Sequence, residues 1–313
     1  MKSRLPIICI MGCTCTGKTE LAISLQKRLP IEIISVDSAM IYEELNIGTD
    51  KPPNKILDTV KHHLINIRKP NEDYNVGNFY KDTEILIKDI HMRNKIPLLV
   101  GGSLMYFNSL YKGLSNLPDK NILEREFLDY LSSKYSSREF HDCLRNIDLA
   151  SYYKIDPNDS QRIQRAIEVY LSTGQPISSF FDDKKTLLNS YDVMTIQMHS
   201  EDRSFIHDKI AARTKEMFKK GFIEEVDSVS RKYNLTSKSK SMKIIGYKHV
   251  LEFLENSGSS EDLINQCIFA TRQLAKRQIT WLKQLPADLR VDIKNYDHNI
   301  INKLVDSHCN LSK

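Results

Sequence analysis

A run of eight residues near the start of the chain has the types and spacing of a phosphate-binding loop. It reads G-C-T-C-T-G-K-T and matches the pattern G-x-x-x-x-G-K-[ST] at every fixed position. In such a loop, backbone N–H groups and the N-terminus of the next helix bind an anion. The lysine adds charge near the distal phosphate, and the last hydroxyl holds Mg²⁺. These residues are Gly12, Cys13, Thr14, Cys15, Thr16, Gly17, Lys18 and Thr19.

The flanking segments predict the elements that would position this loop. Residues 5–11 form a short apolar run, which indicates a buried strand, and residues 18–29 have the apolar spacing of a helix. Further strands are predicted at 32–37, 95–102 and 191–198. With a helix over 78–92, this alternation predicts a P-loop-containing α/β core whose parallel sheet is flanked by helices. Ligands then gather at the carboxyl ends of the strands.

The middle of the chain has a different texture. Strand-like runs disappear there, and charged amphipathic helices take over. We therefore predict an inserted all-helical domain over 118–189, with the core formed by 1–117 and 190–313. The second part of the core is predicted to be helical at 203–222, 223–233, 246–256 and 260–284. The tail from Leu285 does not favour one type of element.

Asp37 stands at the end of the predicted second strand. A carboxylate beside a phosphate-binding loop either helps to hold Mg²⁺ or accepts a proton from a nucleophile. The alternative is that it caps the following turn. The predicted strand at 95–102 ends in Gly-Gly and not in an acid, which disfavours a motor ATPase or a GTPase and favours a compact transferase.

Arg213 occupies an unexpected position on its predicted helix. Ile206, Ile210 and Met217 form an apolar stripe, and Arg213 falls within it. A buried arginine needs an anion, and a diphosphate would supply one. An ion pair or a side chain that reaches solvent at the helix edge is the alternative.

Three basic runs suggest a nucleic acid as a partner. Residues 263–287 contain no acid but hold Arg272, Lys276, Arg277 and Lys283 together with the only tryptophan, Trp281. Residues 237–248 add four lysines, with Gly246 and Tyr247 allowing close approach and stacking. Arg162 and Arg165 form a third group. Solvated basic faces are the simpler explanation for any one run.

Composition excludes several other classes. The 313 residues carry a net charge of +5 and contain no apolar run long enough to span a membrane. We predict a cytoplasmic protein without a signal peptide, and the scattered cysteines suggest a reducing compartment. No Cys/His spacing indicates zinc, and the adjacent pair His62-His63 is expected to pack rather than to bind a metal.

The chain resembles the tRNA dimethylallyltransferases, the bacterial tRNA isopentenyltransferase (IPP transferase) family. The resemblance rests on ordered blocks over nearly the whole chain, among them I-S-V-D-S-A-M-I-Y, I-G-T-D-K-P, P-L-L-V-G-G-S-L-M-Y-F, D-P-N-D-S-Q-R-I-Q-R-A-I-E-V, I-I-G-Y-K and A-T-R-Q-L-A-K-R-Q-I-T-W-L-K. It implies transfer of a dimethylallyl group from dimethylallyl diphosphate to N6 of the adenine 3′ to the anticodon, in tRNAs that read codons beginning with U.

The resemblance also implies roles for individual residues. Asp37 matches the general base, Arg213 matches the arginine that contacts diphosphate, and Lys18 and Thr19 would act on the diphosphate with Mg²⁺. We expect a monomer whose helical insertion binds the anticodon stem-loop. The residues expected to contact tRNA are Asp37, Ser38, Ala39, Met40, Ser103, Arg125, Gln161, Arg162, Ile163, Gln164, Arg165, Lys243, Ile244, Ile245, Gly246, Tyr247, Lys248, Lys276, Arg277, Gln278, Ile279, Thr280, Trp281, Leu282 and Lys283.

Three other functions stay open at this point. An isopentenyltransferase that acts on free adenine nucleotides would need neither the insertion nor the basic runs. A small-molecule or nucleotide kinase would use the same loop to transfer a phosphoryl group from ATP. A non-catalytic RNA-binding protein could keep the loop as a relic, although intact Lys18, Thr19 and Asp37 argue against this.

Overall fold

The computed structural model describes residues 4–118, 121–181, 186–256 and 258–309. The chain divides into two compact units, a larger one from 1–111 and 187–313 and a smaller one from 112–186. The smaller unit lies close to the predicted 118–189 but ends earlier. Leu187 and Leu188 are the reason, because both are buried in a core cluster of the larger unit.

The larger unit is built on a sheet of six strands, all paired in parallel, in the order β3-β2-β4-β1-β5-β6. This confirms the predicted parallel α/β core. The four predicted strands are present, while β3 and β6 are additional. The strands are β1 (Pro6–Gly12), β2 (Ile31–Val36), β3 (His62–His63), β4 (Ile96–Gly101), β5 (Asp192–His199) and β6 (Leu289–Asp292).

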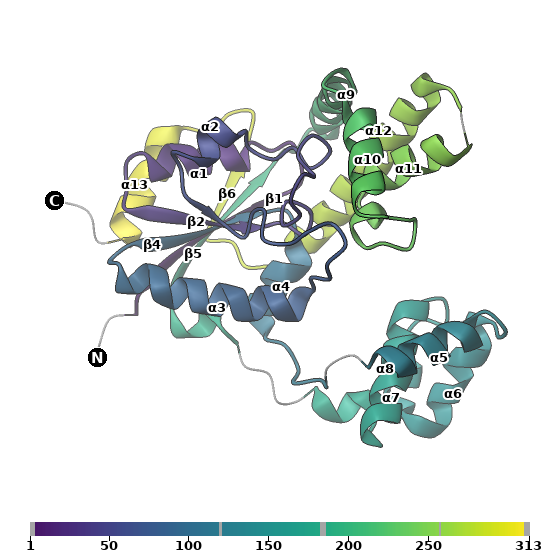
Figure 1. Ribbon diagram of the computed structural model, residues 1–313. Coiled ribbons are helices and arrows are strands. Elements are labelled where there is room, and N and C mark those ends of the chain that lie inside the picture. Colours follow the sequence, from purple (N-terminus) through teal and green to yellow (C-terminus); the bar gives the residue numbers. More distant parts are fainter. Residues whose placement is uncertain (1–3, 119–120, 182–185, 257, 310–313) are drawn as a thin grey trace. The chain divides into compact units, whose positions relative to one another are not determined.

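Helices cover both faces of the sheet, as Figure 1 shows for α1 on one face and α3 on the other. Among the described residues, no helix combines the length and apolar character needed to cross a membrane. The helices of the larger unit are α1 (Lys18–Gln26), α2 (Asn54–Leu57), α3 (Val76–Met92), α4 (Leu104–Lys112), α9 (Arg203–Lys219), α10 (Phe222–Lys232), α11 (Tyr247–Asn256), α12 (Ser260–Leu282) and α13 (His298–His308).

Successive side chains of β1 belong to two different core layers, one on each face of the sheet. Ile8 and Ile10 join the cluster that contains residues of α1 and α13, whereas Ile7 and Cys9 join the cluster that contains residues of α3, α4 and α10 to α12. Successive side chains of a strand point to opposite faces, so a strand covered on both sides must be apolar throughout. This is why residues 5–11 could be recognised as a buried strand.

The smaller unit is all helical and has its own core. Leu144, Ile163, Ala166, Val169 and Ile177 form its buried cluster. Its helices are α5 (Ile122–Ser132), α6 (Ser137–Ile147), α7 (Leu149–Lys154) and α8 (Ser160–Thr173).

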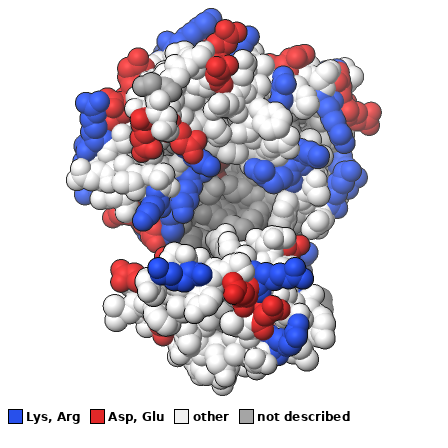
Figure 2. Space-filling model, turned by 90° about the vertical axis from the view of Figure 1, so that its right-hand side faces the viewer, with Lys and Arg blue, Asp and Glu red and all other residues white. Residues whose placement is uncertain are grey.

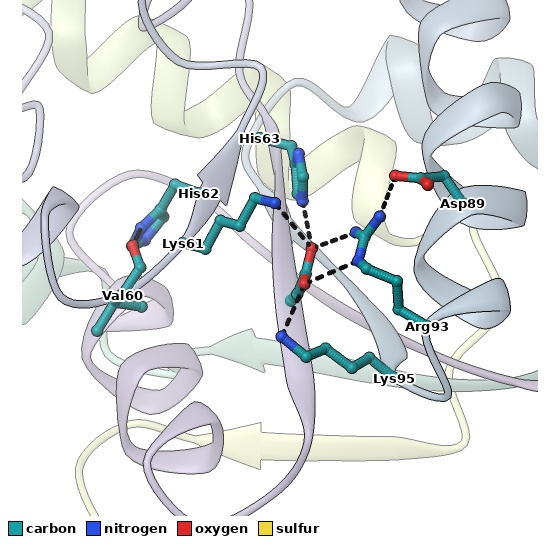
Figure 3. A network of polar contacts seen from close by, with 8 residues as sticks. Val60, Lys61, His62, His63, Asp89, Arg93 and Lys95 are labelled. Atoms are coloured by element: carbon teal, nitrogen blue, oxygen red, sulfur yellow. Dashed lines mark hydrogen bonds and ion pairs between the residues drawn. The ribbon is translucent and has the colours of Figure 1, made fainter.

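A buried carboxylate ties the amino-terminal end of the sheet together (Figure 3). Glu32, on β2, is only 2% exposed. Its oxygens accept hydrogen bonds from Arg93 at 2.7 Å and Lys95 at 2.9 Å, and His63 lies 2.7 Å away. Lys61 lies farther away, at 3.7 Å. These cations hold the pKa of Glu32 at about 2, although burial alone would raise it.

Candidate active site

The phosphate-binding loop lies between β1 and α1, as predicted. Cys15 and Gly17 both adopt left-handed backbone conformations, with φ of 65° and 79°. Gly17 is the residue that precedes α1, and no side chain caps that helix. The first N–H groups of α1 are therefore directed at whatever anion the loop holds.

Close packing explains the first glycine of the loop. A Cβ atom on Gly12 would lie 2.6 Å from the carbonyl oxygen of Met198 and 2.7 Å from the Thr16 hydroxyl. Lys18 folds back along the loop, and its Nζ donates to the carbonyl of Cys13 at 2.5 Å. Burial lowers the pKa of Lys18, because it disfavours the charged amine. A phosphate dianion bound beside Lys18 would have the opposite effect and would favour the charged form.

Asp37 lies at the carboxyl end of β2. Its Oδ1 accepts hydrogen bonds from the backbone N–H groups of Ala39 at 2.8 Å and Met40 at 3.2 Å. It therefore does cap the following turn, which was the alternative reading of this residue. Burial raises the pKa of Asp37, and those two N–H groups partly offset the effect. A carboxylate with a raised pKa is a stronger base.

Two neighbouring strand ends are joined beside Asp37. The hydroxyl of Ser103, just after β4, accepts a hydrogen bond from the backbone N–H of Ser38 at 3.0 Å. Gly101 is required at this point, because a Cβ atom there would lie 2.0 Å from the carbonyl oxygen of Val36. The loop after β2 is thereby fixed against β4.

Arg213 projects from α9 to the phosphate-binding loop. Its Nη2 donates to the Thr14 hydroxyl at 2.6 Å, and its Nη1 donates to Asp50 at 3.1 Å. Its Nε is buried without a hydrogen-bond partner. An anion bound in the loop would lie within the field of this guanidinium group. Arg213 thus has an ion pair, the simpler explanation, and also a place beside the loop.

The segment that carries Asp50 is held from α10. The backbone N–H groups of Asn46, Ile47 and Gly48 donate to the carboxylate of Glu225 at 3.0, 2.8 and 3.3 Å. The Tyr247 hydroxyl donates to the same carboxylate at 2.6 Å. Glu225 thus fixes the residues that lead to Asp50.

These groups surround a single cavity of about 1090 Å³ in the larger unit. Thr14 to Thr19, Asp37 to Met40, Ser103 and Arg213 line it, and so do Lys243 to Gly246, Arg277, Gln278 and Trp281. Figure 2 shows Lys and Arg side chains gathered on one face of the larger unit. The cations that line the cavity are Lys18, Lys51, Lys209, Arg213, Lys240, Lys243 and Arg277. Such a site suits a polyanion.

The predicted stacking of Tyr247 on a base does not fit the position of its ring. The side chain of Tyr247 is fully buried, where its ring packs against Phe222 and its hydroxyl binds Glu225. It cannot stack on a base. Leu282 and Ile163 are likewise buried in the cores of their units, so a contact at these positions would have to come from their backbone.

Other predicted residues differ in their exposure. Lys276, on α12, and Lys283, the residue that follows this helix, are exposed. In the smaller unit, Arg162 is exposed and pairs with Asp159. Arg165 is partly buried, where its guanidinium group donates to the carbonyl of Pro118 and pairs with Glu168. Of the third basic group, Arg165 is thus already bound to other residues of the protein, whereas Arg162 is exposed.

Sequence reasoning missed Asp50 and Lys209. Asp50 orients Arg213, yet it sits in a loop without periodicity, and its left-handed backbone (φ 56°) is not readable from its type. Lys209 lies four residues before Arg213 on α9 and lines the same cavity. The i, i+4 spacing could have identified it.

The residues present fit a divalent metal ion that a bound diphosphate would also ligate. Thr19 and Asp37 offer oxygen atoms to the same cavity, and oxygen is the ligand that Mg²⁺ prefers. Among the described residues, no group of three or more His, Cys, Asp or Glu side chains could bind a metal without such a partner.

Comparisons with known proteins place this chain in a family. The family model described as IPP transferase matches residues 40–285. A tRNA dimethylallyltransferase of Coxiella burnetii is 42% identical over 303 residues, which is 96% of each chain. One of Methylobacillus flagellatus is 40% identical over 94% of each chain.

Solved structures are also similar to this chain over nearly its whole length. The tRNA isopentenylpyrophosphate transferase of Bacillus halodurans superposes with a TM-score of 0.68 at 29% identity and covers 99% of both chains. A eukaryotic dimethylallyltransferase acting on tRNA gives a TM-score of 0.81 at 26% identity, covering 96% of this chain and 78% of that one. With the family model matching most of its length, this chain belongs to the IPP transferase family.

Proposed function

We propose that this protein transfers a dimethylallyl group from dimethylallyl diphosphate to N6 of the adenine 3′ to the anticodon, position 37, in tRNAs that read codons beginning with U. One observation carries the proposal. A single cavity brings a phosphate-binding loop, the carboxylate of Asp37 and the guanidinium of Arg213 together in a member of the IPP transferase family. The protein is a prenyltransferase, and its relatives are named tRNA dimethylallyltransferases.

Asp37 is the proposed general base. The exocyclic amine of adenine is a poor nucleophile, because its lone pair is delocalised into the ring. Holding it against the allylic carbon supplies proximity. As the new N–C bond forms and the C–O bond to diphosphate breaks, Asp37 takes the proton that the amine loses. The raised pKa of Asp37 supports this role.

The phosphate-binding loop is proposed to bind the leaving group. Negative charge builds on the diphosphate as the C–O bond breaks, and Lys18, Arg213 and the first N–H groups of α1 are placed to stabilise it. Thr19 would hold Mg²⁺, which when bound neutralises part of the same charge. In this reading, the loop binds a diphosphate without ATP hydrolysis.

The tRNA is proposed to bind over the basic side of the cavity. Lys243, Arg277 and Trp281 line it, and Lys276 on α12 and Lys283 at the end of this helix are exposed. The adenine must leave its stack to reach Asp37, so we expect the base to be flipped out. Arg125, Gln161, Arg162 and Gln164 are the proposed contacts of the smaller unit with the anticodon stem-loop. We propose that a monomer acts in the cytoplasm.

The test is direct. The purified protein is incubated with Mg²⁺, dimethylallyl diphosphate and unmodified tRNA of this class, and the digested nucleosides are analysed by mass spectrometry. We expect an adenosine heavier by one C5H8 unit. Lys18→Ala should abolish it, whereas Lys27→Ala, at the other end of α1, should not.

Other products would identify the alternatives. Product on free AMP but none on tRNA would indicate the nucleotide-prenylating enzyme. Consumption of ATP without prenyl transfer would indicate a kinase. If the protein binds tRNA and yields none of these products, the non-catalytic reading is favoured.

A further inference from the structure

One side chain on α12 is joined to the phosphate-binding loop although the two are far apart in sequence. The backbone N–H of Thr14 donates to Oε1 of Gln278 at 2.9 Å. Nε2 of the same amide donates to the carbonyl oxygen of Gly102 at 2.8 Å. Gln278 therefore links the loop after β1 to the end of β4.

The structure makes room for this link. A Cβ atom on Gly102 would lie 2.7 Å from Nε2 of Gln278, closer than such contacts occur. Glycine is thus the residue that lets the amide reach its acceptor. Both partners of Gln278 are backbone groups of residues that line the same cavity, and Thr14 belongs to the loop that would hold a diphosphate.

Thr14 connects this link to Arg213. Its backbone N–H is held by Gln278, and its hydroxyl accepts the 2.6 Å hydrogen bond from Arg213. A shift of Thr14 would move the contact that Arg213 makes with the loop. The amide of Gln278 thus influences the diphosphate site indirectly, through the position of Thr14.

We propose that Gln278 is a positioning residue for the reaction, which sets the phosphate-binding loop and Arg213 for the diphosphate. It does so in place of the tRNA contact that the sequence suggested for it. Its neighbours Arg277 and Trp281 line the cavity where tRNA is proposed to bind, so α12 serves both substrates with different residues. This inference rests on the proposed function for its consequence in turnover, but not for its consequence in diphosphate binding.

The test compares Gln278→Leu with Gln273→Leu, a half-buried glutamine of the same helix that does not line the cavity. For Gln278→Leu we expect the KM for dimethylallyl diphosphate to rise about ten-fold, as two lost hydrogen bonds allow. The dissociation constant for tRNA should change by less than about two-fold. Gln278→Glu keeps the acceptor for Thr14 but replaces the donor to Gly102 by an acceptor and adds negative charge beside the diphosphate, so its KM should rise at least as much as that of Gln278→Leu. Gln273→Leu should match wild type.

A second measurement separates this inference from the proposed function. Inorganic diphosphate with Mg²⁺ is titrated into the full chain by calorimetry, without tRNA. Affinity should fall in Gln278→Leu, and also in Gly102→Ala, which keeps the amide but blocks its approach. If wild type modifies no tRNA, the proposed function fails while this comparison still holds. Unchanged diphosphate affinity in both folded variants, or a loss confined to tRNA binding, would overturn the inference.

Discussion

Replacing Glu32 by glutamine tests how much the ionic network at the amino-terminal end of the sheet stabilises the fold. The carboxylate is 2% exposed, and its pKa is lowered from 4.5 to about 2. That difference corresponds to about 3 kcal/mol of preferential interaction with the ionised form. We expect Glu32→Gln to lower the free energy of unfolding at pH 7 by about this amount, because it leaves Arg93, Lys95 and Lys61 around a neutral group.

The contribution of Glu32 to the free energy of unfolding should depend on pH. The folded protein holds the Glu32 proton less tightly than the unfolded chain, so the contribution is fully present above pH 4.5 and is lost as the pH falls toward 2. Urea unfolding at pH 7 and at pH 3.5 should therefore give a deficit of about 3 kcal/mol that shrinks to about 2 kcal/mol.

The matched control is Asp89→Asn. Asp89 pairs with the same Arg93, but its side chain is 45% exposed. Exposed pairs contribute about 0–1 kcal/mol, so this variant should stay close to wild type. Prenyl transfer per folded molecule should persist in both, because Asp37 lies at the opposite end of β2. A deficit for Glu32→Gln that is no larger than that of the control, or that is equal at both pH values, would refute the reasoning.

Four further results are expected. Asp37→Asn should lower turnover by about 10²–10⁴-fold with tRNA retention in filter binding unchanged. In wild type, kcat/KM should fall on the acid side with an apparent pKa above 3.8, because burial raises the pKa of Asp37 and only its ionised form accepts a proton; a limb at or below 3.8 would contradict this. Asp50→Asn should raise the KM for dimethylallyl diphosphate up to about five-fold, since its pair with Arg213 is part-exposed. Its melting temperature should not move. Tyr247→Phe should lower the free energy of unfolding in urea by about 1 kcal/mol, because the bond of the hydroxyl to Glu225 is lost; an unchanged free energy of unfolding would contradict this.

The elements around the phosphate-binding loop could be predicted because their signals are local. An apolar strand, a glycine pattern and an amphipathic helix are each visible within a dozen residues or so. The two missed strands had no such signal. β3 has only two residues, His62 and His63, and β6 reads Leu-Arg-Val-Asp, with an intermediate or exposed residue at three of its four positions.

The finer geometry of the site depends on contacts between distant segments. Arg213 was recognised because it broke an apolar stripe, whereas Asp50 broke no pattern. Tyr247 was misjudged because a tyrosine among lysines looks the same in sequence whether its ring faces RNA or the core. Gln278 lay within a stretch that the family resemblance assigned to tRNA, and only the fold places its amide against Thr14.

The order of strands has a consequence for how the chain is made. β1 is the first strand to be synthesised, yet it is central and pairs along its whole length with β5, which follows only after all of 112–186. The helical unit, whose core draws on its own residues, can fold by short-range contacts while β1 still lacks that partner. A nascent chain therefore leaves one edge of this apolar strand unpaired until 112–186 and β5 have been synthesised. We expect it to rely on protection from chaperones during that interval.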